Sequence, residues 1–127
     1  MAYIIACLMA SLSFLINKVL LRYLGMSVII SLSPAVEEGA KTLLAYYLGA
    51  DVLATHILFG LLEAGYDWIQ NRHGGLPAAL LSIGGHTLFG LLTVEAAVLT
   101  GSIWLGMAVA LIAHLAWNVT VIRISSS

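Results

Sequence analysis

The sequence predicts an all-α membrane protein, a single domain over residues 1–127 in which five transmembrane helices form a polytopic bundle. Of the 127 residues, 61% are apolar and only 9% are charged, whereas about 25% of a soluble domain is charged. The mean hydropathy is +1.05. Eleven charged side chains cannot cover the surface of a water-soluble globule, so that class of protein is excluded. The apolar residues also lack the alternating pattern of strands.

Five apolar segments of about 20 residues each, enough to cross ~30 Å of hydrocarbon, are separated by short polar or glycine-containing stretches. Each segment ends at such a stretch: the first near Arg22, the second at Gly49 and the third before Asn71. Pro77 suits the first turn of the fourth segment, and Gly101 separates the fourth from the fifth. The predicted helices cover about residues 2–22, 27–48, 52–70, 77–99 and 103–124.

The basic residues indicate an orientation in the membrane. With five crossings, Lys18, Arg22, Arg72 and Arg123 all fall on the side of the C-terminus, and the opposite side carries Asp51. Since loops rich in Lys and Arg stay in the cytoplasm, we expect the N-terminus outside and the C-terminus in the cytoplasm. The chain would then be a multi-pass protein of the plasma or cytoplasmic membrane. Its net charge of −1 gives no electrostatic reason to expect nucleic acid as a partner.

Several polar side chains occur inside these apolar segments, where ionisable groups are costly and commonly mark a functional site. Counted from the cytoplasmic end of each helix at 1.5 Å per residue, Glu37, Glu63, His86 and His114 lie at nearly one depth, roughly 10–15 Å from the inner edge. These four residues belong to four different helices. We therefore expect a shared polar centre that is open to water from the cytoplasmic side.

The spacing of these residues along each helix predicts a different role for each of them. Glu37 and Glu38 point about 100° apart, and Lys41 can reach either of them, so one glutamate would be neutralised while the other is left for chemistry. His114 and Asn118 are one turn apart and can offer two hydrogen-bond donors to one substrate oxygen. Taken alone, the Glu37–Lys41 pair also fits a structural ion pair between helices.

Other conspicuous residues fit structural tasks. Phe59 and Phe89 are expected in the core, and His56 and Glu95 are expected to reach toward water at the outer boundary. Pro34 removes one backbone hydrogen bond and is expected to kink its helix beside the glutamates.

Four motifs on four consecutive helices resemble those of the superfamily that contains the type II CAAX-prenyl endopeptidases and the PrsW-type intramembrane proteases. They are Glu37-Glu38-Gly39-Ala40-Lys41, Phe59 to Glu63, the intramembrane His86, and His114 to Asn118. The EExxK and FxxxE spacings are closer to the PrsW branch. The chain has fewer helices than most members of that superfamily, so a second copy or a partner membrane chain could complete it.

The resemblance implies an endopeptidase that hydrolyses a peptide bond of a membrane-embedded or membrane-associated protein. Glu37 would act as general base on a water that His86 helps to position, and His114 with Asn118 would stabilise the oxyanion. Glu38 and Glu63 would orient the base or anchor Lys41. No cofactor is expected. Glutamate and histidine are also good zinc ligands, but the chain has no HExxH and metal dependence stays open.

Two other classes of function remain open on the sequence. The superfamily includes non-proteolytic members resembling the scaffold subunit of γ-secretase, so the polar centre could hold helices or a partner's transmembrane segment. A proton or ion pathway is less favoured, because transporters usually show repeats and broken helices in matching halves.

Overall fold

The computed structural model describes residues 2–24, 27–70 and 75–125, and these residues form an all-helical structure without strands. The helices are α1 (Ala2–Leu24), α2 (Ser27–Gly39), the π-helix η1 (Ala40–Leu44), α3 (Ala45–Tyr47), α4 (Val52–Gln70), α5 (Gly75–Thr100) and α6 (Ile103–Ser125). The second predicted helix is therefore one continuous rod built from α2, η1 and α3. The other boundaries agree with the prediction to within a few residues.

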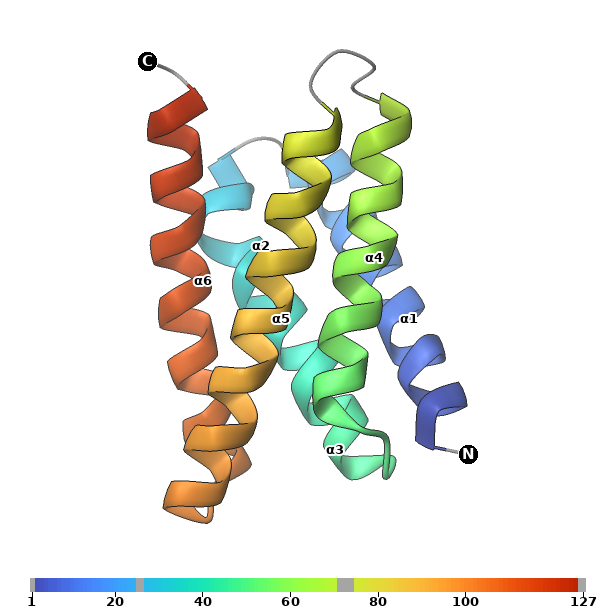
Figure 1. The fold of residues 1–127 in the computed structure, drawn as a ribbon, viewed down its shortest axis with the longest axis vertical. Coiled ribbons are helices and arrows are strands. Elements are labelled where there is room, and N and C mark those ends of the chain that lie inside the picture. Colours follow the sequence, from blue (N-terminus) through green and yellow to red (C-terminus); the bar gives the residue numbers. More distant parts are fainter. Residues whose placement is uncertain (1, 25–26, 71–74, 126–127) are drawn as a thin grey trace.

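Five antiparallel rods pack side by side (Figure 1). Contacts between neighbours close a ring in the order α1, α4, α5, α6 and α2, and η1 also contacts α1, α4 and α6. The chain starts at one end of the bundle and finishes at the other, which we call the C-terminal end (Figure 1). Helices α1, α4 and α6 all finish at the C-terminal end, as the alternating direction of the five rods requires.

Turns at the opposite end are set by glycine and by an aspartate. Gly49 and Gly101 both adopt φ of 70°, the left-handed conformation that commonly ends helices and that other residues rarely adopt. Asp51 then caps α4, because its Oδ1 accepts a hydrogen bond of 2.8 Å from the backbone N–H of Ala54. These turns hold α3 against α4 and α5 against α6.

Most large apolar side chains lie on the outside of the bundle, whereas small residues, polar residues and the rings of Phe59 and Phe89 lie within it. Leu99 is 82% exposed, whereas Ala10, Thr42, Thr55 and Thr93 are completely buried. Among the described residues, the helices that are long and apolar enough to cross a membrane are three, α1, α5 and α6. This distribution supports a membrane protein, because the outer surface of a soluble bundle would carry charged residues instead.

The rod that carries the two glutamates departs from α-helical geometry, but not where the sequence predicts. Helix α2 continues through Pro34, and the irregular segment is η1, which begins at Ala40. The π-helical turn directs Lys41 and Thr42 into the bundle, where both are fully buried. Such π-helical turns occur frequently at functional sites.

Candidate functional site

The ammonium group of Lys41 lies at the centre of a buried polar cluster. Its Nζ is 2.8 Å from Oε1 of Glu38, 3.9 Å from Oε2 of Glu37 and 3.0 Å from Nδ1 of His86. It also lies 4.4 Å from the ring centre of Phe59, which is fully buried as expected. Lys41 and Glu38 thus form a completely buried ion pair, and Glu38 is the glutamate whose charge is neutralised.

His86 links Lys41 to Glu63. The ammonium can only donate, so Nδ1 of His86 accepts its hydrogen bond and the ring proton resides on Nε2. That Nε2–H donates to Oε2 of Glu63 at 2.8 Å. Both ring nitrogens are therefore engaged within the protein, and in this arrangement neither is available to hold a water.

His114 lies between the two glutamates. Its Nδ1 is 2.9 Å from Oε1 of Glu38, and because the ionised carboxylate can only accept, the proton of a neutral ring resides on Nδ1. The lone pair on Nε2 then faces Oε2 of Glu37 across 4.0 Å. The ring stacks on Phe89 with centroids 4.6 Å apart, which fixes its orientation.

In both glutamates Oε2 is buried without a hydrogen-bond partner, but Glu37 lies 3.9 Å from Nζ of Lys41 whereas Glu38 lies 2.8 Å from it. Oε1 of Glu37 accepts a hydrogen bond of 2.9 Å from Oγ of Ser33, which in turn is hydrogen-bonded to the side-chain amide of Asn17 on α1. Oε2 is buried and makes no hydrogen bond, although it faces Lys41 and His114 at 3.9 and 4.0 Å. Lys41 is therefore paired more closely with Glu38 than with Glu37.

A cavity of about 430 Å³ is lined by Glu37 and not by Glu38. Residues from all five rods line it: Asn17, Leu21, Ser33, Glu37, Glu63, Asp67, Ala78, Leu81, Ser82, Gly85, His86, Phe89, His114, Trp117, Asn118, Val121 and Ile122. On each helix, most of these residues lie on the C-terminal-end side of the cluster. The cavity therefore extends from Glu37 toward the C-terminal end, which the basic residues predict to be cytoplasmic.

The expectation that four distant residues share one level is confirmed. Glu37 and His114 face each other across 4.0 Å, the rings of His86 and His114 are 5.3 Å apart, and Glu63 is bonded to His86. Asn118 lines the same cavity one turn beyond His114.

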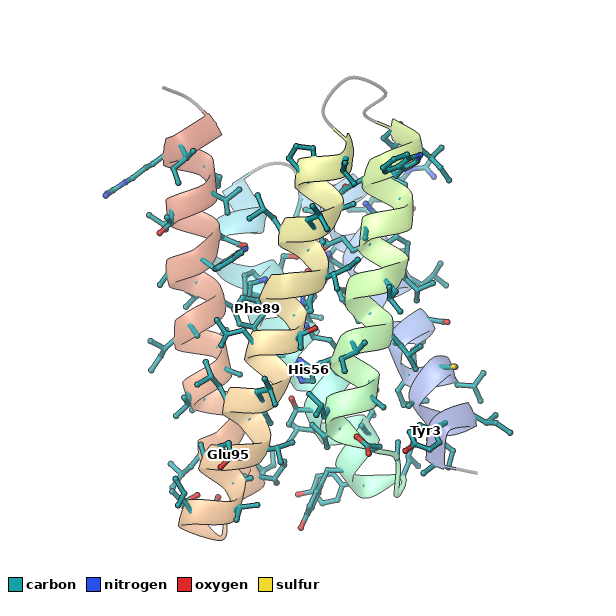
Figure 2. All side chains as sticks on the ribbon, in the orientation of Figure 1. Tyr3, His56, Phe89 and Glu95 are labelled. Carbon is teal, nitrogen blue, oxygen red and sulfur yellow. The ribbon has the colours of Figure 1, made fainter. Side chains whose placement is uncertain are left out.

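The expectation for His56 is wrong. This side chain is completely buried, with Nε2 at 3.2 Å from Oγ1 of Thr42 and at 3.8 Å from Oε2 of Glu38. Figure 2 shows it inside the bundle between α4 and α5, whereas Glu95 lies exposed near the α5–α6 turn, as expected. The seven-residue spacing from His56 to Glu63 places both on one helix face and could have indicated this position.

Asn17 and Ser33, the two residues that support Glu37, were also not singled out from the sequence. The sequence of α1 does contain a pattern that indicates a buried Asn17. The buried residues of this helix follow helical spacing: Ala6, Ala10, Ser13 and Asn17. An asparagine that continues a stripe of small residues is expected to face a neighbouring helix.

Within the described residues, no group of three or more His, Cys, Asp or Glu side chains is arranged to hold a metal ion. The ammonium of Lys41 occupies the point where the carboxylate of Glu38 and the ring of His86 converge.

No protein-family model, no curated protein and no solved structure matches this chain.

Proposed function

We propose that this protein is an intramembrane endopeptidase in which Glu37 activates the hydrolytic water. The observation that carries the proposal is that Glu37 lines the cavity, while its buried Oε2 makes no hydrogen bond and lies 4.0 Å from Nε2 of His114. A single water spans such a gap with hydrogen bonds of about 2.8 Å to both atoms. A carboxylate and an imidazole lone pair that hold one water are the elements of general base catalysis.

In this mechanism Oε2 of Glu37 takes a proton from the water while the water oxygen attacks the carbonyl carbon of the substrate. The proton then passes to the departing amide nitrogen as the C–N bond breaks, and Glu37 is regenerated. Nε2 of His114 orients the water, and the amide of Asn118 is the assigned donor to the oxyanion, a contribution of about 3–4 kcal/mol.

This assignment changes two tasks that the family resemblance implies. His86 becomes a positioning residue that holds Lys41 and Glu63, since both of its nitrogens are engaged. His114 orients the water, because its ring proton is committed to Glu38 and a neutral ring has no second donor for the oxyanion. Glu38 and Lys41 keep the supporting tasks that the sequence indicates.

The reaction is best tested with purified protein in liposomes that contain single-pass model substrates, in water enriched in ¹⁸O. We expect one ¹⁸O atom in the new carboxyl terminus of the product, and Glu37→Gln should reduce the rate by about 10²- to 10⁴-fold. The matched control is Glu95→Gln, which changes an exposed glutamate distant from the cavity. Equal cleavage by Glu37→Gln, or no cleavage by the unaltered protein, would contradict the proposal.

We further propose that the chain crosses the membrane five times with its C-terminal end in the cytoplasm. Lys18, Arg22 and Arg123 lie toward that end of α1 and α6, while Arg72 lies outside the described residues. In a Cys7→Ser background, a cysteine at Ser102 should react with an impermeant maleimide from outside. A cysteine at Gln70 should react only after the membrane is opened.

A non-proteolytic scaffold is the second candidate, favoured by the extent of pairing in the cluster. Glu38 binds Lys41 and His114, and His86 binds Lys41 and Glu63, so this network ties the α2–η1–α3 rod, α4, α5 and α6 together. A scaffold would retain a co-purifying membrane partner in the Glu37→Gln variant and never release a product.

A further inference from the structure

We infer that the cavity binds a positively charged side chain of the substrate, a lysine or arginine near the bond that is cut. The inference rests on the proposed function, because that function identifies the ligand as a peptide. The structural feature that carries it is the acidic wall of the cavity, formed by Glu63 and Asp67 on α4 together with Glu37 on α2.

Charge within the cavity is unbalanced. Three carboxylates line it, those of Glu37, Glu63 and Asp67, and none of the described lining residues is Lys or Arg. Lys41 lies near the lining residue Glu37, but its nearest carboxylate is that of Glu38 at 2.8 Å, so the charges of Lys41 and Glu38 offset each other. Lys18 on α1 is not a lining residue; its Nζ lies 3.4 Å from the ring centre of Tyr66, and its charge interacts with that of Asp67.

Two further observations indicate a ligand and not merely an acidic surface. The side chain of Glu37, which lines the cavity, is 95% buried, and its Oε2 makes no hydrogen bond. In addition, Oγ of Ser82 lies 3.3 Å from both Oε2 of Glu63 and Oδ2 of Asp67. Since a hydroxyl has one proton, Ser82 can donate to only one of these carboxylates at a time.

A guanidinium or ammonium group supplies the donors that such carboxylates lack. Arginine can donate two parallel hydrogen bonds to one carboxylate, and the Trp117 ring in the same cavity adds a surface that cations favour. Asp67 is one turn beyond Glu63, about 6 Å closer to the C-terminal end. In an extended peptide at about 3.3 Å per residue, the basic side chain would lie about two residues from the scissile bond.

The test uses the full-length protein in phosphatidylcholine nanodiscs, whose neutral lipid does not itself attract basic peptides. Fluorescent apolar peptides differ at one position, Lys, Gln or Glu, and carry acetylated N-termini. A Gln peptide with a free N-terminus tests whether an amino terminus supplies the cation instead. Binding is measured by anisotropy, and cleavage of the same peptides is followed separately.

We expect the Lys peptide to bind about 10- to 100-fold more tightly than the Gln peptide, the contribution of a hydrogen bond to a charged group. The Glu peptide should bind most weakly. Asp67→Asn should weaken this preference, and Asp67→Lys should weaken it further, because only Glu37 and Glu63 then remain as lining carboxylates. Glu95→Gln, the exposed control, should leave it unchanged. Thermal unfolding of each variant verifies that it is folded.

Equal binding of the three acetylated peptides, or an unchanged preference in Asp67→Lys, would overturn the inference even if cleavage continues. Tight binding of the Gln peptide with a free N-terminus would overturn the assignment to a side chain. Charge-selective binding without cleavage of any peptide would instead overturn the proposed hydrolysis and leave this site standing.

Discussion

Replacing Lys41 by methionine tests whether the polar cluster is organised around a buried cation. Methionine keeps the length of the side chain and removes the ammonium, which bonds Glu38 at 2.8 Å and His86 at 3.0 Å while fully buried. Removing one partner of a buried ion pair leaves the other charge uncompensated and costs about 3–5 kcal/mol. We therefore expect the folding equilibrium constant to fall by roughly two to three and a half decades.

Equilibrium unfolding in mixed micelles, followed by tryptophan fluorescence, gives the free energy directly. The matched control is Lys18→Met, because Lys18 is partly exposed and rests on the ring of Tyr66, a contact worth about 0.5–1 kcal/mol. The double variant Lys41→Met/Glu38→Gln should be more stable than Lys41→Met alone, since the carboxylate closest to the lost ammonium is also removed. The interpretation fails if Lys41→Met lowers the free energy of unfolding no more than Lys18→Met does. It also fails if adding Glu38→Gln restores none of the lost free energy.

Further predictions concern the packing that holds the site. Phe89→Ala should lower the free energy of unfolding by about 3–5 kcal/mol, because the ring is 1% exposed and stacks on His114; chemical denaturation measures it, and a loss below 1 kcal/mol would contradict this packing. Gly106→Ala should separate α5 from α6, because an added Cβ would overlap the carbonyl oxygen of Thr93; a lower melting temperature is expected, and an unchanged one would count against the close approach. Gly84→Ala, whose added Cβ meets nothing within 4 Å, should instead stabilise the protein by about 0.5–1 kcal/mol, so a loss in the same melting experiment would be unexpected.

The level at which the polar groups meet could be predicted from the sequence, because depth along a helix is proportional to residue number. Counting 1.5 Å per residue from the helix ends placed Glu37, Glu63, His86 and His114 together, and the distances among them agree. The same count did not bring His56 to the site. That residue lies closer to the far end of α4, and its burial depends on η1, whose Thr42 covers it.

The sequence spacing could not predict which of the two glutamates pairs closely with Lys41, because Lys41 is within reach of both. The π-helical turn brings Lys41 closer to Glu38 than to Glu37, and Asn17 and Ser33 from α1 and α2 hold the other carboxylate toward the cavity. A change in helical geometry of this kind leaves no sign in the hydrophobic pattern that defines the segment.

The amino-acid sequence by itself determined the helices, their order and the depth of each polar group, because these depend on local composition and on the constant rise of a helix. The tertiary structure decided which nitrogen faces which oxygen, how His56 became buried and which walls enclose the cavity. Those features depend on the rotation of each helix about its axis and on contacts between residues far apart in the chain, and neither is fixed until all five rods pack together.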